Sequence, residues 1–202
     1  MRKREFLRAL LLPAAAAPVA AWAEADAKRS SRSSAMSPPT LLTITGDIGR
    51  TNRGPFDKSL DVLMSKHELS FDKAFNVDFP MLASLPAATI EVTIEYDGKK
   101  HRLSGPSVSD VLKLADARIS DATKLSLRAV DGYAPKLTVS EARRLGFIIA
   151  THRDGKPLAL GGLGPLWAIY PADRFPEVMS RALTDRFAAC PWGLYHVDVV
   201  NA

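Results

Sequence analysis

The chain has 202 residues, of which 47% are hydrophobic, 24% charged and 7% aromatic, a composition that argues against a disordered, collagenous or multi-span membrane protein. Its formal net charge is +5, but residues 1–23 hold four of the 27 Lys+Arg and one of the 22 Asp+Glu, so the remainder carries a net charge of only +2. Because a nucleic-acid binder needs a basic face to neutralise phosphates, we expect no nucleic-acid partner.

The first 23 residues have the three parts of a signal peptide. Residues 1–8 are cationic, residues 9–20 form an apolar run, and Ala21-Trp22-Ala23 places small residues where a signal peptidase reads them. The run is too short to span a bilayer, so we expect export to the periplasm and cleavage near Ala23. Residues 3–8 (KREFLR) resemble the twin-arginine export motif with Lys in place of the first Arg, so either export route stays open.

Residues 24–39 are rich in Ser, Ala and Arg and lack a hydrophobic period, which predicts a flexible linker. From residue 40 to residue 202 the composition is that of one compact domain. Residues 89–96 alternate strictly between apolar and polar side chains and predict a strand. Asp97-Gly98 supplies the positive φ angles of a tight turn, so this strand is expected to return as a hairpin through residues 99–103.

Three further strands are predicted along the chain. Residues 124–130 alternate, with Leu125, Leu127 and Ala129 facing inward, and Asp131-Gly132 then marks a turn. After a second turn at Asp154-Gly155, residues 166–170 (LWAIY) are apolar on both faces, which is typical of a central, covered strand. The last strand is expected to bury Tyr195, Val197 and Val199.

Helices are shorter and fewer. Ser107 and Asp110 form a capping-box-like start for a helix that continues to Ala115, and Thr138 and Glu141 open another that ends near Gly146. Residues 176–187 predict a third helix. Short strands mixed with a few short helices indicate a compact, β-rich α+β fold.

Motifs for common catalytic chemistries are absent from the sequence. It contains no G-x-S-x-G elbow, no P-loop and no strand-linked G-x-G-x-x-G, and its four histidines have no metal-ligand spacing. The loop at residues 160–165 (LGGLGP) is rich in glycine, and such a loop lets backbone N–H groups approach an anion or a flat ring. An ordinary flexible connection before a buried strand explains the same glycines.

Aromatic residues gather near these loops and turns. Trp167 and Tyr170 follow the glycine-rich loop, Trp192 precedes the last strand, and Tyr133 follows the Asp131-Gly132 turn. Aromatic side chains at strand ends can stack on a planar heterocycle, although each of them also fits as core filling.

Six motifs occur in an order that resembles a known family. They are LTITGD at residues 42–47, LSGP at 103–106 ahead of a helix, VDGY at 130–133, DGKPL at 154–158, GPLWAIYP at 164–171 and WGLYHVDV at 192–199. Together they resemble the molybdopterin-binding domain of the sulfite oxidase type, in a small, exported, stand-alone form. The resemblance covers the whole of residues 40–202.

The resemblance implies a β-rich α+β fold whose pocket holds a pterin-dithiolene cofactor, with molybdenum bound through one cysteine thiolate. In the matching segment, residues 93–99 (TIEYDGK), this chain has no sulfur. A tyrosine or a carboxylate is a poor substitute for a soft thiolate, so we expect no bound metal. The single cysteine, Cys190, lies about 90 residues later, and we expect it to be a small buried packing residue.

We therefore expect a periplasmic protein that binds a pterin or molybdopterin-like molecule without catalysis. Small exported proteins that resemble this chain report a reduced pterin to a membrane-bound signalling enzyme, such as one that controls cyclic di-GMP. Asp131 and Glu95 are candidate acceptors for the guanidine-like edge of a pterin, although each is equally explained as a turn former or a solvated strand residue. The expected ligand-binding residues are Ser104, Arg128, Asp131, Tyr133, Gly162, Gly164, Trp167, Tyr170 and Trp192.

Two other functions stay open. One is a molybdopterin-dependent oxidoreductase with atypical metal ligation, which the near-match to the twin-arginine motif favours and the missing thiolate opposes. The other is a scaffold that kept the fold but lost every ligand.

Overall fold

The computed structural model describes residues 37–201. The signal peptide expected at residues 1–23 and most of the linker expected at 24–39 lie outside these residues. Within the described range, no helix is both long and apolar enough to cross a membrane.

The largest sheet has five strands and joins the two ends of the described chain. β1 (Thr40–Gly46) runs parallel to β11 (Leu194–Val200) and antiparallel to β2 (Ala74–Asp78). β11 continues the sheet through β5 (Lys124–Ala129) to β6 (Lys136–Thr138), both in antiparallel pairs. The order is therefore β2-β1-β11-β5-β6, and the last strand lies at its centre.

Alternating side chains explain how this sheet covers the core. Leu125, Leu127, Val197 and Val199 are at most 1% exposed, which confirms the inner faces predicted for β5 and β11. Tyr195, expected to be buried with them, is only half-buried. Polar residues of this sheet are also buried, and His196 is among them at 2% exposed.

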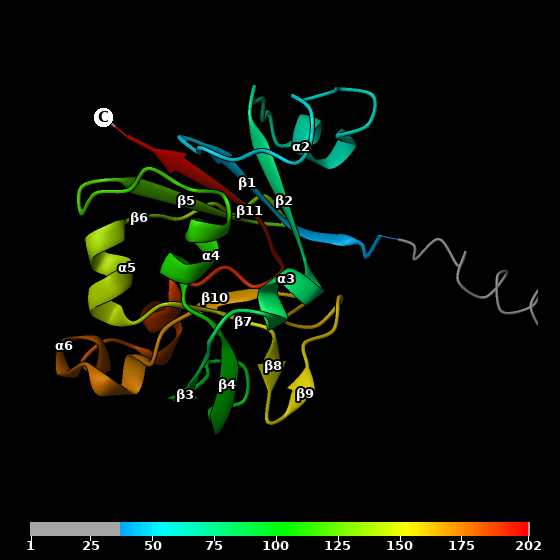
Figure 1. The fold of residues 1–202 in the computed structure, drawn as a ribbon. Coiled ribbons are helices and arrows are strands. Elements are labelled where there is room, and N and C mark those ends of the chain that lie inside the picture. Colours follow the sequence, from blue (N-terminus) through cyan, green and yellow to red (C-terminus); the bar gives the residue numbers. More distant parts are fainter. Residues whose placement is uncertain (1–36, 202) are drawn as a thin grey trace, which may run out of the picture. The chain divides into compact units, whose positions relative to one another are not determined.

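Two smaller sheets complete the strand content of the described chain. One has the order β3-β4-β8-β9, and the other pairs β7 with β10. Figure 1 shows the four-stranded sheet at the end of the domain opposite the five-stranded sheet, with β7 and β10 between them. The strands are β3 (Ala87–Thr93), β4 (Lys100–Pro106), β7 (Ile148–Ala150), β8 (His152–Arg153), β9 (Lys156–Pro157) and β10 (Trp167–Ile169).

Most of the hairpin and covered-strand predictions are confirmed. β8 and β9 pair across Asp154-Gly155, where both residues have positive φ angles. β3 and β4 also pair as predicted, but residues 94–99 connect them in place of a tight turn at Asp97-Gly98, and of these two residues only Gly98 has a positive φ. All three residues of β10 are buried, as expected for a covered strand. Tyr96, however, lies in the turn beyond β3 and is 53% exposed, so it does not continue the inner face of that strand.

The two capped helices form where the sequence places them. α4 (Val108–Leu114) begins where the Ser107 hydroxyl accepts a hydrogen bond from the Asp110 N–H. α5 (Val139–Leu145) begins with a full capping box on Thr138 and ends at Gly146, which has a φ of 71°.

The single helix predicted over residues 176–187 is wrong. This stretch contains two short pieces, α6 (Pro176–Met179) and the 3₁₀ turn η2 (Leu183–Phe187). The Arg186 side chain donates to the carbonyls of Met179 and Arg181, at 2.9 and 3.1 Å, so side-chain donors occupy carbonyls that a continuous helix would use.

Three short helical elements had no clear signal in the sequence: α2 (Val62–Lys66), α3 (Phe79–Ala83) and the 3₁₀ turn η1 (Ala172–Arg174). The strands β2, β6 and β7 were not predicted either. α4 and α5 pack between the five-stranded sheet and the smaller sheets (Figure 1). Sheets and short helices around one continuous apolar core confirm the α+β class.

Candidate functional site

A cavity of about 200 Å³ opens where three distant segments meet. The segments are the turn between β3 and β4, the turn after β5, and residues 184–192 ahead of β11. We call this cavity the aromatic cleft. Its lining residues are Glu95, Tyr96, Ala129, Asp131, Tyr133, Thr184, Phe187, Ala188, Cys190, Pro191 and Trp192.

Three aromatic side chains in the lining remain accessible. Tyr96 is 53% exposed, Tyr133 is 51% exposed, and Trp192 is half-buried. Behind them, the Tyr96 ring contacts the buried Trp167 ring, with centroids 6.3 Å apart. The cleft therefore offers accessible aromatic surface to a flat ligand.

Three aromatic residues hold one wall of the cleft by donating side-chain hydrogen bonds to its backbone carbonyls. Trp167 donates its Nε1–H to the Cys190 carbonyl at 3.0 Å, and Tyr170 donates its hydroxyl to the Arg186 carbonyl at 2.7 Å. The Tyr133 hydroxyl donates to the carbonyl of Ala188 between them. Trp167 and Tyr170 are 1% and 4% exposed and do not line the cleft, so their side chains position residues 186–190 from behind.

Two carboxylates line the same cleft. Glu95 is half-buried, and no cation forms an ion pair with it within residues 37–201. Partial burial raises the pKa of the neighbouring Tyr96 to about 12, and the charge of the Glu95 carboxylate contributes to this rise. Asp131 is exposed, and its Oδ1 accepts the Tyr133 N–H at 2.9 Å. Glu95 is therefore the more enclosed of the two acceptors.

Cys190 lines the cleft and supplies its sulfur atom. It is 5% exposed, and burial raises the pKa of its thiol far above neutral. Soft metals bind the thiolate, and this environment favours the thiol. In the described part of the chain, no three His, Cys, Asp or Glu side chains gather in a way that could hold a metal ion. The residues present do not fit a metal–thiolate centre.

The other residues expected at the site lie elsewhere. Arg128 lies outside the cleft lining and donates from Nη1 to the Gly132 carbonyl at 3.2 Å. Gly164 is buried, and a Cβ there would clash with the Leu158 backbone, so this glycine serves the packing of the chain itself. Gly162 and Ser104 line two other cavities.

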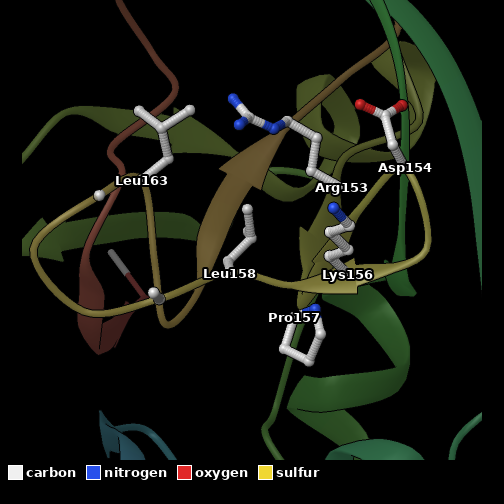
Figure 2. Close-up of a pocket in the computed structure, with 8 residues that line it drawn as sticks. Arg153, Asp154, Lys156, Pro157, Leu158 and Leu163 are labelled. Atoms are coloured by element: carbon white, nitrogen blue, oxygen red, sulfur yellow. The ribbon is translucent and has the colours of Figure 1, made fainter.

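The second cavity has a volume of about 420 Å³ and lies beside the β8–β9 hairpin (Figure 2). Its lining residues are Arg153, Asp154, Lys156, Pro157, Leu158, Ala159, Gly162 and Leu163. We call it the hairpin cavity. The third cavity, of about 330 Å³, brings Ser104 together with His152 and the exposed Phe79.

The structure thus brings Asp131, Tyr133 and Trp192 together, and it adds Tyr96 to them. Tyr96 was missed as a binding residue because the alternation of residues 89–96 placed it on the apolar face of a predicted strand. The available signal was its position in residues 93–99, the segment in which the resembled family has its thiolate.

Comparisons with known proteins support the fold only. No family model and no curated protein matches the chain. Among solved structures, it is similar to the sulfane dehydrogenase SoxCD from Paracoccus pantotrophus, with a TM-score of 0.54 and 11% sequence identity. The match covers 80% of this chain but only 38% of the SoxCD chain. At this level of identity the likeness shows a similar fold alone.

Proposed function

We propose that the aromatic cleft binds a pterin-like molecule and that the protein is a binding protein without catalytic activity. The observation that carries this proposal is the convergence of three accessible aromatic side chains, Tyr96, Tyr133 and Trp192, on one cavity. A pterin is a flat, fused nitrogen heterocycle, and aromatic faces stack on such rings.

The size of the cleft favours a small ring system. Ligand pockets for drug-sized molecules have volumes of roughly 300–1,000 Å³. The aromatic cleft has about 200 Å³, which suits one fused bicycle and leaves a long substituent outside in solvent. A free pterin therefore fits this space better than a full molybdopterin.

The polar edge of the ligand has an acceptor in the same cleft. The guanidine-like edge of a pterin presents parallel N–H donors, and one carboxylate can accept two of them as a bidentate pair. Glu95 is half-buried and free of ion pairs in the described chain, so its carboxylate is the principal candidate. Asp131 supplies a second, more exposed acceptor.

Location and partner belong to the same proposal. The signal peptide that the sequence predicts at residues 1–23 supports export to the periplasm. There the pterin-loaded protein would act on the periplasmic domain of a membrane-bound signalling enzyme. Export is tested by fractionating the native host and sequencing the N-terminus of the mature protein, which we expect to begin near residue 24.

A fluorescence titration with pterin and dihydropterin tests the binding directly. We expect Trp192→Ala to weaken binding by about two- to tenfold, because stacking contributes roughly 0.5–1.5 kcal/mol beyond area burial. Phe79→Ala is the matched control, since Phe79 is also an exposed aromatic residue but lies outside the aromatic cleft. Equal affinity in the Trp192 and Phe79 variants would argue against a stacked ligand in the cleft.

The second candidate is a molybdopterin-dependent oxidoreductase with atypical metal ligation. The likeness to a dehydrogenase fold supports this general kind of protein, and the buried Cys190 thiol opposes it. Metal analysis of protein purified from its own host separates the candidates, since stoichiometric molybdenum would favour the enzyme. An unchanged melting temperature across a panel of pterins would instead favour a scaffold without a ligand.

A further inference from the structure

Two cations, Arg153 and Lys156, line the hairpin cavity. Arg153 and Lys156 are register partners at the ends of β8 and β9, so their side chains stand directly opposite across the hairpin. Figure 2 shows both side chains on the same side of the hairpin, with the Lys156 ammonium toward the base of the Arg153 side chain and the Arg153 guanidinium extending away from it. Like charges in this position destabilise a strand pair.

The protein supplies no carboxylate that offsets this repulsion by ion pairing. Neither Arg153 nor Lys156 takes part in an ion pair within residues 37–201. The carboxylate between them in sequence, Asp154, is directed elsewhere. Its Oδ2 lies 2.6 Å from His101 Nδ1, and its Oδ1 accepts the Arg102 N–H at 2.9 Å. The two cations are therefore available to an external anion.

The opposite side of the cavity is formed by the loop that carries Gly162 and Leu163. A Cβ added to Gly162 would meet only the Ala159 carbonyl oxygen, at an ordinary contact distance of 3.4 Å, and the residue does not have a positive φ. The fold therefore does not require glycine here. Without a side chain at residue 162, the cavity stays open beside the two cations.

Apolar side chains complete the lining. Leu158 and Leu163 are half-buried and lie on the side of the cavity formed by the loop (Figure 2). A ligand in this space would meet positive charge on one side and apolar surface on the other.

We propose that the hairpin cavity binds the phosphate group of a small organic phosphate monoester. A phosphate carries close to two negative charges at neutral pH, which matches one guanidinium and one ammonium. The apolar side chains Leu158 and Leu163 contact the organic part of the ester. This site is separate from the aromatic cleft and does not depend on the proposed pterin binding.

Two probes distinguish the source of the phosphate. Inorganic phosphate and phenyl phosphate are titrated into the protein by calorimetry at low ionic strength. Tighter binding of phenyl phosphate supports the ester as the ligand. Binding of inorganic phosphate alone, or equal binding of the two probes, overturns the assignment of the apolar lining to an organic group.

Substitutions of Lys156 and Arg153 test whether these two cations bind the phosphate. We expect Lys156→Gln to weaken phenyl phosphate binding by about tenfold, because the phosphate loses a charge-assisted hydrogen bond. Lys100→Gln is the matched control, since Lys100 is an exposed lysine on β4 outside the cavity. Unchanged affinity in the double variant Arg153→Gln, Lys156→Gln overturns the proposal.

Thermal unfolding supplies a readout that a purely structural role would not give. Without phosphate, Lys156→Gln should melt at or above the wild-type temperature, because the repulsion is removed. With phenyl phosphate, the wild type should gain melting temperature and the variant should gain little. Gly162→Ala should melt like the wild type and bind more weakly. A lower melting temperature for Lys156→Gln without ligand would assign Lys156 a structural role and overturn the proposal.

Discussion

The indole N–H of Trp167 donates to the carbonyl of Cys190 at 3.0 Å. This bond joins β10, a covered strand in the interior, to the segment that forms one wall of the aromatic cleft. Trp167 also forms an isolated backbone bridge with Trp192, an aromatic residue of that cleft. Trp167 thus holds this wall of the cleft in two ways, because its indole binds the Cys190 carbonyl and its backbone pairs with the backbone of Trp192.

Trp167→Phe tests this positioning role. The substitution keeps an aromatic ring in the core but leaves the buried Cys190 carbonyl without its donor, so we expect a loss of about 1–3 kcal/mol in the free energy of unfolding. Pterin affinity should fall as well, because residues 186–190 lose one of their anchors. Urea unfolding measures the first effect and fluorescence titration the second. Trp192→Phe is the control, and a Trp167→Phe protein as stable as that control would refute the role.

The two carboxylates of the cleft should differ in importance. We expect Glu95→Gln to weaken pterin binding by about tenfold, since a charge-assisted bidentate pair is replaced by an amide that offers only one acceptor oxygen. Asp131→Asn should have a smaller effect, because Asp131 is exposed and one of its oxygens already accepts the Tyr133 N–H. The reverse order in a fluorescence titration would assign the polar edge of the ligand to Asp131.

Buried His196 should make the protein less stable in mild acid. Its Nε2 lies 2.8 Å from the Thr45 hydroxyl, which itself donates to Asp198, so His196 is neutral with its proton on Nε2. Burial lowers the pKa of His196 from 6.5 to about 4, although the Asp198 charge partly offsets this effect.

The direction of the pH effect follows from the two protonation states. As the pH falls below 6.5, the unfolded chain binds a proton at His196 that the folded chain refuses, so the folded state loses stability until about pH 4. We expect a loss of roughly 2 kcal/mol between about pH 7 and about pH 5. Denaturant unfolding measures it, and His196→Gln should show a smaller pH dependence. Equal pH dependence in the two proteins would mean that His196 does not titrate as described.

His101 should have the opposite pH dependence. Its Nδ1 lies 2.6 Å from Asp154 and its Nε2 lies 3.0 Å from Asp97, so both nitrogens donate only when the ring is charged. The hydrogen bond to Asp154, with a further one to Asp97, raises the pKa of His101. Its stabilising contribution is therefore complete below 6.5 and is lost as the pH rises through the folded-state pKa.

A melting series between about pH 6 and about pH 9 checks this prediction. The wild type should lose more melting temperature than His101→Gln over that range. Parallel curves for the two proteins would contradict it. Because Asp97 follows Tyr96 and Asp154 follows Arg153, this histidine also links the turn at the aromatic cleft to the hairpin of the second cavity.

Local signals in the sequence predicted much of the fold. The capping box at Thr138, the turn at Asp154-Gly155 and the covered strand β10 each depend on a few neighbouring residues, and all three form as expected. The helix predicted over residues 176–187 is the exception, because it does not form as one element. In the two pieces that form instead, the Arg186 side chain bonds back to two carbonyls, and composition does not reveal such bonds.

The site was less predictable because its members meet only in three dimensions. Trp192, Tyr133 and Asp131 were expected as neighbours and share the cleft, whereas Trp167 acts through a bond to a residue 23 positions away. Strand alternation placed Tyr96 on the apolar face of a strand over residues 89–96, but the strand ends at Thr93 and the turn leaves this ring at the cleft. The burial of His196 likewise depends on packing that strand periodicity does not encode.

The most direct test of pterin binding is to measure which small molecules and how much molybdenum the protein carries when its own host makes it. The protein is purified from that host without added ligand and denatured, and the released small molecules and the molybdenum content are measured. We expect the denatured protein to release a pterin and to contain no stoichiometric molybdenum. Stoichiometric molybdenum, or a protein that releases no pterin and binds none when titrated, would contradict it.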